Sequence, residues 1–330
     1  MTQPHDRPQP TAQPQPTAQP QPLALIYGTI AIDTLYTPRG EASDVLGGSG
    51  PYAALAARLL SPHTRMIGVV GDDFAPCFRE ALETCGVSME HVARIPGKTF
   101  SWKARYEEDM NHRTSLSTEE GVQEVWDAAL PPELRQAQLL VACNVTPRLQ
   151  TRVLEQCRQA QFTMADFMES WIIRERAYAD RLLGEVDLAL MNDSEVCCYA
   201  GTDDALEGGY RLLDAGPRYV VVKHGSAGST LYHRASNGEV RLFRVPAWPL
   251  VHPVDPTGAG DSYMGALGGY LLAHLNGGQP TWEHMKRGVA YATIIAAATC
   301  EAFGTRALME LTPAAVEQRL QAFRAMTSWA

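Results

Sequence analysis

The chain has 330 residues, 45% of them hydrophobic and 20% charged, which is enough for one large globular domain or two small ones. Its formal net charge is −9 and no lysine- or arginine-rich block occurs, which argues against a nucleic-acid partner. No apolar run reaches the roughly 20 residues of a membrane span, no export signal opens the chain, and the seven cysteines contain no C-x-x-C pair, so we expect a cytoplasmic protein without a membrane partner.

The first 22 residues differ in composition from the rest of the chain. They contain TAQPQPTAQPQP, a tandem repeat of proline and glutamine that has no amphipathic period and cannot bury a core. We predict a disordered tail over residues 1–22 and a single domain over residues 23–330.

From Leu23 onward, short apolar runs alternate with longer helical segments, a pattern typical of β-α-β units. The runs are nearly continuous in apolar residues, which indicates a sheet covered on both faces. The predicted fold class is therefore α/β, with three α/β/α layers and a mostly parallel central sheet. The predicted strands lie in residues 23–28, 64–71, 137–145, 162–167, 186–192 and 219–225, and helical segments in residues 50–60, 146–160, 261–276, 282–304 and 312–326.

Two polar stretches interrupt this alternation, at about residues 34–46 and 99–117. Neither carries enough apolar surface to stand alone, so we predict a small β-strand lid over one edge of the domain. The second stretch is rich in charge. Its charged side chains either contact a substrate or form a solvated strand face: Lys103, Arg105, Glu107, Glu108, Asp109 and Arg113.

The stretch VDPTGAGDSYMGA, residues 254–266, places small residues directly before a helical run. Gly258, Ala259 and Gly260 are expected at the helix N-terminus, where free N–H groups and the helix dipole bind anions such as a phosphoryl group. Asp261 in the same turn suits a general base that takes a proton from an attacking hydroxyl. The alternative is that Asp261 only caps the helix.

Together these segments make the sequence resemble the PfkB family of carbohydrate kinases, also called ribokinase-like. DPTGAGDSYMGALG matches its C-terminal signature, and LGGSGPYAALAARL resembles its N-terminal di-glycine signature. YGTIAIDT, GVVGDDF, NDSE, VVVKHGSAG and AAATCEAFGT resemble further family segments in the correct order. The resemblance covers nearly all of residues 23–312.

The resemblance implies a role for each matching residue. It makes Asp261 the catalytic base, with Gly258, Ala259 and Gly260 as the anion hole, and it assigns Asp33, Gly47 and Gly48 to substrate hydroxyls. It assigns Asn192, Lys223, Gly225 and Gly228 to the nucleotide, with Glu195 supporting Mg²⁺ through water. It also implies a possible monovalent cation such as K⁺ beside Asp255 and Thr257, and a homodimer formed through the lid.

Two positions depart from the family pattern. Tyr52 stands where asparagine is usual after the di-glycine pair, and Ser49 stands where lysine is frequent. The Tyr52 ring either stacks on a flat substrate or packs inward on its helix. This departure leaves a nucleoside as open as a plain sugar.

Two rival interpretations carry less support. Gly48, Gly50 and Ala53 spell G-x-G-x-x-A with Asp72 and Asp73 about 20 residues on, as in a dinucleotide-binding fingerprint, but the preceding segment is too polar for a buried strand. An inactive kinase-like scaffold is the non-enzyme alternative. We predict an ATP- and Mg²⁺-dependent kinase that phosphorylates a hydroxyl, primary by expectation, of a sugar or sugar-like molecule, with a nucleoside as the alternative acceptor.

Overall fold

A nine-stranded sheet lies at the centre of the computed structural model, which describes residues 22–275 and 277–328. All but the last residue of the predicted disordered tail therefore lies outside the described residues. The sheet order is β13-β12-β11-β10-β9-β8-β1-β4-β5. Neighbours from β5 to β11 are parallel, and β12 and β13 are antiparallel, which confirms the mostly parallel sheet. Its strands are β1 (Ala24–Tyr27), β4 (Thr64–Val70), β5 (Val92–Arg94), β8 (Leu139–Ala142), β9 (Phe162–Asp166), β10 (Leu188–Asn192), β11 (Tyr219–Lys223), β12 (Ser229–Arg234) and β13 (Val240–Val245).

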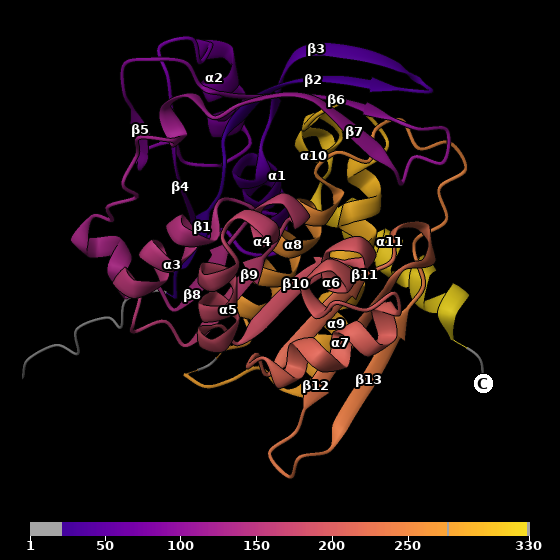
Figure 1. The fold of residues 1–330 in the computed structure, drawn as a ribbon. Coiled ribbons are helices and arrows are strands. Elements are labelled where there is room, and N and C mark those ends of the chain that lie inside the picture. Colours follow the sequence, from indigo (N-terminus) through magenta and orange to yellow (C-terminus); the bar gives the residue numbers. More distant parts are fainter. Residues whose placement is uncertain (1–21, 276, 329–330) are drawn as a thin grey trace, which may run out of the picture.

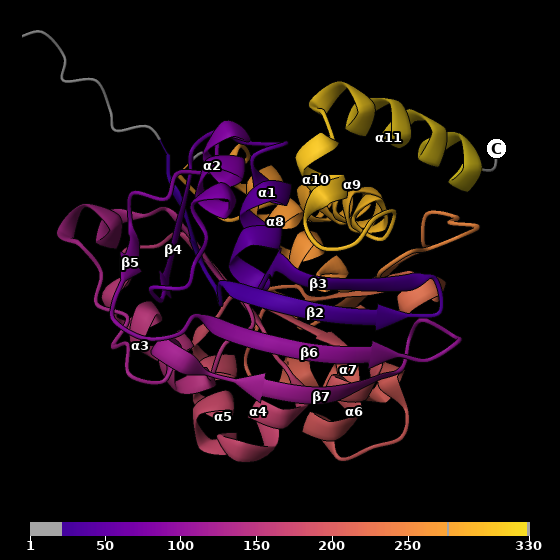
Figure 2. The same cartoon turned by 90° about the horizontal axis from the view of Figure 1, so that it is seen from above.

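Helices cover both faces of this sheet, as Figure 2 shows. Successive strand side chains point to opposite faces: Ala24 and Ile26 belong to one buried cluster, Leu25 and Tyr27 to the other. The first face carries α1 (Ser49–Ala57), α2 (Pro76–Thr84), α8 (Ala259–Leu272), α9 (Trp282–Thr299), α10 (Arg306–Glu310) and α11 (Pro313–Thr327). The second carries α3 (Pro147–Gln156), α4 (Glu169–Arg174), α5 (Arg176–Glu185), α6 (Asp193–Ala200) and α7 (Ala205–Asp214).

Helices α1 and α8 touch at the level of their backbones. A Cβ atom on Gly265 would lie 2.0 Å from the carbonyl oxygen of Ala53, and one on Gly269 would lie 2.5 Å from that of Ala57. Only glycine leaves room for this approach. The close packing joins the di-glycine segment before α1 to the glycine-rich turn before α8.

A second sheet of four strands, in the order β3-β2-β6-β7, lies above the large sheet in Figure 1 and runs across it in Figure 2. Its strands are β2 (Ala31–Thr37), β3 (Gly40–Gly47), β6 (Phe100–Tyr106) and β7 (Arg113–Glu119). The pair β2 and β6 is parallel, and the other pairs are antiparallel. This sheet fits the predicted lid.

Two hydrogen bonds join the lid sheet to the loop before α8. The Thr37 hydroxyl donates to the carbonyl of Val254 at 2.9 Å, and the Thr257 hydroxyl donates to the Tyr106 hydroxyl at 3.1 Å. The lid thus lies against the loop that carries the glycine-rich signature. Among the helices of the described residues, none combines the length and the apolar character needed to cross a membrane.

Candidate active site

Three polar side chains come from the carboxyl ends of three adjacent strands, where ligands bind in open α/β sheets. Asp166 ends β9, Asn192 ends β10 and Lys223 ends β11. The Lys223 ammonium forms an ion pair with Asp166, with 3.0 Å between Nζ and Oδ1, and both side chains are largely buried. The sheet edge therefore holds a charged pair at the position expected for a ligand site.

The glycine-rich turn forms the N-terminus of α8. Gly258 is the N-cap residue, and its φ of 76° lies in the left-handed region that favours glycine. A Cβ atom there would also lie 2.4 Å from three atoms of the Tyr52 ring. Both the backbone conformation and the contact with Tyr52 thus require glycine at this position.

The three small residues were expected to present unpaired N–H groups, and for Ala259 this is wrong. Its N–H donates to the carbonyl of Pro256 at 3.2 Å, because the chain makes a tight turn before α8 begins. The carbonyl of Gly258 accepts the first helical bond, from Ser262 at 2.8 Å. The anion-binding capacity of the turn therefore does not depend on Ala259.

Lys223 lies directly beside the same turn. A Cβ atom on Gly260 would lie 2.9 Å from the Lys223 Nζ. Although burial opposes the charge, the carboxylates of Asp166 and Glu195 raise the pKa of Lys223 and keep it protonated. The charged ammonium thus lies at the helix N-terminus, so two positive features meet at one point.

Asp261 lies in the first turn of α8 and is partly exposed. Burial of the carboxyl and the nearby Asp166 carboxylate raise its pKa to about 7, and Lys223 opposes this increase. An acid with a pKa near neutrality is suited to accept and return a proton at physiological pH.

Asn192 and Glu195 form a capping box at the start of α6. The Asn192 side chain accepts from the Glu195 N–H at 2.9 Å, and the Glu195 side chain accepts from the Asn192 N–H at 2.7 Å. Burial raises the pKa of Glu195 to about 7. Within residues 22–275 and 277–328, no group of three or more His, Cys, Asp or Glu side chains could hold a metal ion.

Asp33 lies on lid strand β2 against the di-glycine segment and is only 2% exposed. A Cβ atom on Gly47 would lie 1.9 Å from its Oδ2. Burial and the carboxylates of Asp255 and Asp261 raise its pKa to about 8, against N–H donation from Gly48. Its Oδ1 is buried without a hydrogen-bond partner, which leaves an acceptor free for a ligand.

Tyr52 is 1% exposed and belongs to the buried cluster beneath α8. Its ring packs against Gly258, since a Cβ atom on Gly258 would lie 2.4 Å from three ring atoms. Its hydroxyl is buried without a hydrogen-bond partner. Burial, and to a smaller extent the negative charges of Asp255 and Asp33, raise the pKa of this hydroxyl well above its usual value. The structure thus places Tyr52 inward on its helix, under the glycine-rich turn.

The loop after β11 carries the other predicted nucleotide residues. Gly225 begins a short 3₁₀ turn, Gly225–Ala227, and Gly228 follows it, both with positive φ. A Cβ atom on Gly225 would lie 2.6 Å from the side-chain oxygen of Asn111, which belongs to the β6–β7 turn of the lid. The tip of the lid therefore touches this loop.

Asp255 and Thr257, the predicted cation residues, are both buried. The Asp255 carboxylate accepts from the Thr257 N–H at 2.9 Å and from the Gly304 N–H at 3.0 Å. Asp255 thus joins the signature loop to the segment after α9.

Sequence reasoning did not single out Asp166. An acid at the carboxyl end of a fully buried strand was the available signal, because such an acid needs a partner.

The structure also rules out the dinucleotide-binding fingerprint considered from the sequence. Gly48 follows lid strand β3 rather than a strand of the large sheet, and Asp72 and Asp73 accept hydrogen bonds from the N–H groups of Gly97 and Thr99.

Comparison with known proteins assigns the family. Residues 31–310 match the pfkB family of carbohydrate kinases. The chain belongs to this family. PfkB proteins are phosphotransferases that act on hydroxyl groups of sugars or nucleosides, and ATP as the donor is implied by the family. The predicted fold class and enzyme class are therefore confirmed, and the inactive scaffold loses support.

Several relatives span most of the chain. A cytidine kinase from Thermococcus kodakarensis is 27% identical, over 81% of this chain and 94% of its own. A nucleoside kinase from Methanothermobacter thermautotrophicus is 25% identical, over 82% of this chain and 84% of its own.

Solved structures share the fold. The Burkholderia thailandensis nucleoside kinase in complex with inosine has a TM-score of 0.73 at 21% identity, covering 92% of this chain and 99% of that one. An E. coli structure in complex with ATP and Mg²⁺ also has a TM-score of 0.73, at 18% identity, covering 91% of this chain and 99% of that one.

Proposed function

We propose that this PfkB kinase transfers the γ-phosphoryl group of ATP to a hydroxyl, primary by expectation, of a nucleoside. The observation that carries the phosphoryl transfer is the meeting of Asp261, Lys223 and the α8 N-terminus at one sheet edge. The nucleoside class is supported by the two relatives that cover more than four fifths of the chain, a cytidine kinase and a nucleoside kinase. A plain sugar is the competing acceptor class.

Asp261 acts as the general base. In its ionised form it accepts the proton of the acceptor hydroxyl as the oxygen forms its bond to the γ-phosphorus, and the bond from that phosphorus to the leaving ADP oxygen breaks. Its pKa of about 7 means that the ionised form is well populated at neutral pH while the carboxylate remains basic. Without this group, the attacking hydroxyl would keep its proton.

Lys223 and the glycine-rich turn stabilise the negative charge of the transferred group. The ammonium and the helix N-terminus lie within contact distance of each other, and both attract anions. The missing side chain at Gly260 lets the Lys223 ammonium lie against the turn, because a Cβ atom there would lie 2.9 Å from Nζ. These residues fit a phosphate-bearing substrate.

Mg²⁺, when bound with ATP, would neutralise phosphate oxygens that the protein leaves uncompensated. We assign its support to Glu195, which holds water ligands rather than the ion itself, and we assign the nucleotide to Asn192, Lys223, Gly225 and Gly228. Glu195 fits this role because it is buried and acidic at the sheet edge. K⁺ beside Asp255 and Thr257 would balance the negative charge of that buried carboxyl.

The acceptor lies between the lid and the turn. Asp33 offers an unpaired buried oxygen and stands close enough to Asp261 for that carboxylate to raise the pKa of Asp33. Gly47 lets the backbone lie against the Asp33 carboxyl, because a Cβ atom there would lie 1.9 Å from Oδ2, and the Gly48 N–H donates to the same carboxyl. A substrate hydroxyl would satisfy the unpaired Asp33 oxygen, whose burial without a partner otherwise costs about 1–3 kcal/mol.

A homodimer formed through the lid is part of the proposal. All seven residues of β7, an edge strand of the lid sheet, are exposed, and exposed edges pair readily with another chain. Light scattering that reports a mass of 36.1 kDa at micromolar concentration would contradict the dimer.

The test of function is an ATP-consumption assay with Mg²⁺ across nucleosides, pentoses and hexoses, run with and without K⁺. Asp261→Asn is the catalytic control, and Asp127→Asn, at an exposed position distant in sequence from the site, is the matched control. We expect turnover on nucleosides, a loss of about 10²–10⁴-fold in Asp261→Asn and no change in Asp127→Asn. Full turnover in Asp261→Asn would overturn the assignment of the base, and turnover on sugars alone would overturn the acceptor class.

A further inference from the structure

The residues that directly follow Asn192 and Lys223 form a contact between two adjacent strands. Strands β10 and β11 are parallel neighbours, and Asn192 lies opposite Lys223 in their register. The next residues are Asp193, which begins α6, and His224, which precedes the 3₁₀ turn Gly225–Ala227. The Asp193 carboxylate accepts a hydrogen bond from His224 Nδ1. This side-chain pair joins the two segments to which we assign the nucleotide.

The second ring nitrogen of His224 extends the contact to β12. Nε2 lies 2.8 Å from Oγ1 of Thr230, a buried residue of that strand. Nε2 accepts from the hydroxyl when the ring is neutral and donates to it when the ring is charged, so both forms keep the contact. Only 13% of the His224 side chain is exposed. We call Asp193, His224 and Thr230 the histidine clamp, because together they fix the orientation of the ring.

The loop after His224 offers only short side chains. Gly225, Ser226 and Ala227 are all exposed. The backbone of this loop bonds to itself: the Ala227 N–H donates to the His224 carbonyl at 3.0 Å, and the His224 N–H donates to the Gly228 carbonyl at 2.8 Å. The His224 ring therefore provides a side-chain anchor at the base of a loop whose own side chains are too small to pack.

A phosphate-binding site depends on the exact placement of its donors. Hydrogen bonds weaken steeply as their angles depart from the ideal, and groups in a binding site have to be held to within about 0.5 Å. The ion pair between Lys223 and Asp166 connects β11 to β9. The histidine clamp connects the loop after β11 to the start of α6. Both contacts hold β11 and its loop in position, and the clamp also fixes the loop relative to Asn192.

We propose that His224 and Asp193 are positioning residues for the phosphoryl donor, which hold the loop of residues 225–228 beside the start of α6 so that both segments bind one ATP molecule. The inference rests on the proposed nucleotide site and adds the pair of side chains that sets its geometry. The pair acts through Asn192, Gly225 and Gly228 and does not touch the reacting atoms.

Four variants test the histidine clamp. His224→Ala removes both contacts of the ring, and Asp193→Ala removes the partner carboxylate. Asp193 is 52% exposed, a position where the fold tolerates truncation. The double variant His224→Ala with Asp193→Ala measures whether the two losses are one. His224→Asn is the rescue variant, because its amide lies near the position of Nδ1 and retains the bond to Asp193.

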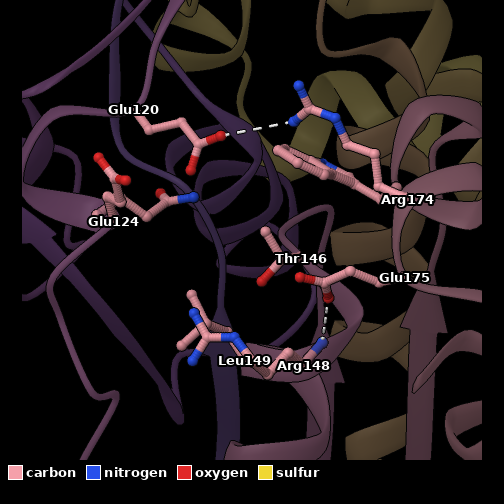
Figure 3. Close-up of a pocket in the computed structure, with 9 residues that line it drawn as sticks. Glu120, Glu124, Thr146, Arg148, Leu149, Arg174 and Glu175 are labelled. Carbon is pink, nitrogen blue, oxygen red and sulfur yellow. Dashed lines mark hydrogen bonds and ion pairs between the residues drawn. The ribbon is translucent and has the colours of Figure 1, made fainter. Parts of the chain in front are cut away.

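Glu120→Gln is the matched control. Glu120 pairs with Arg174 at 3.7 Å, at the edge of a cavity of about 230 Å³ between the segment after β7 and helix α4 (Figure 3). Like Asp193, Glu120 is a partly exposed carboxylate in an ion pair, and the residues that line this cavity include none that we assign to the nucleotide. The control thus weakens a comparable ion pair away from the nucleotide segments.

The readouts are the Kd of ATP with Mg²⁺, measured by calorimetry without an acceptor, and the steady-state kinetics. We expect His224→Ala and Asp193→Ala each to raise Kd and KM for ATP about 5- to 20-fold, a typical loss for one hydrogen bond to a charged group. The double variant should lose no more than either single variant, because both remove the same contact. His224→Asn and Glu120→Gln should keep the Kd of the wild type for ATP. In all clamp variants, kcat at saturating ATP and KM for the acceptor should stay unchanged.

An unchanged Kd for ATP in both single variants would overturn the clamp and leave the kinase assignment intact. Additive losses in the double variant would overturn the pairing of His224 with Asp193. Parallel losses in ATP binding, acceptor KM, kcat and the free energy of unfolding would also overturn the positioning role, because they would make the pair a general structural contact. A wild-type protein that binds no ATP would overturn the proposed donor and the clamp with it.

Discussion

The contact between Gly258 and the Tyr52 ring predicts a specific energetic coupling. Gly258→Ala places a methyl group 2.4 Å from three ring atoms and forces alanine to a φ of 76°. The left-handed backbone costs alanine about 1–2 kcal/mol. The overlap with a buried ring adds about 1–3 kcal/mol. We therefore expect Gly258→Ala to lower the free energy of unfolding by about 2–5 kcal/mol.

The two contributions are separated by a double-mutant cycle. In a Tyr52→Ala background the ring is gone, so Gly258→Ala should cost only the backbone part, and the coupling energy should equal the steric part of about 1–3 kcal/mol. Gly86→Ala is the matched control, because Gly86 has a φ of 82° and a Cβ atom there would meet nothing within 4 Å. It should cost only about 1–2 kcal/mol.

The assay is urea unfolding, monitored by a secondary-structure signal. It is applied to the wild type, Gly258→Ala, Tyr52→Ala, the double variant and Gly86→Ala, and initial rates are measured on the same proteins. Additive costs of Gly258→Ala and Tyr52→Ala would refute the ring contact as the reason for glycine. So would a cost of Gly258→Ala no larger than that of Gly86→Ala. If Gly258→Ala lost turnover but kept the wild-type free energy of unfolding, the turn itself would have moved to accommodate the methyl group.

The other predictions concern charge. Because Asp261 must be ionised to accept a proton and its pKa is raised to about 7, kcat/KM should fall tenfold per pH unit well below pH 7, and a profile flat down to pH 5 would contradict this. Asp33 has a folded pKa of about 8, above its unfolded value, so the folded state binds the extra proton between about pH 4 and 8 and loses stability as pH rises through that window. Asp33→Asn should therefore raise Tm at pH 8.5 and leave it nearly unchanged at pH 4, and the reverse order in a calorimetric scan would refute the shift. Lys223→Met leaves Asp166 buried without its partner and should lower the free energy of unfolding by about 3–5 kcal/mol. Adding Asp166→Asn to this variant should recover stability without recovering turnover. Equal stability of the single and double variants would exclude the ion pair.

Six of the nine strands of the large sheet followed from local patterns: β1, β4, β8, β9, β10 and β11. Each apolar run that was predicted as a strand does contain a strand. A strand covered on both faces must be apolar along its whole length, and this pattern can be recognised directly in the sequence. Helix ends were less well placed: the helix expected to end at residue 304 ends at Thr299. Tertiary contacts rather than periodicity decide where the last turn stops.

The candidate site was predicted in part. Motifs identified Asp261, Lys223 and the Asn192–Glu195 pair, since each carries a recognisable neighbourhood in the sequence. Asp166 was missed because its partner lies 57 residues away, and nothing local distinguishes it from any acid at the end of a strand. The partial burial of Asp261 and its raised pKa were equally invisible, because both depend on side chains from other strands.

The sequence by itself determined the alternation of strands and helices, the glycine-rich turn and the family. These are properties of short segments, whose backbone preferences and apolar periods depend on neighbouring residues alone. Only the tertiary structure decided that Tyr52 lies beneath Gly258 and that Lys223 joins Asp166 to the turn. Each of these contacts joins residues far apart in the chain, and packing of whole elements, rather than any local preference, brings them together.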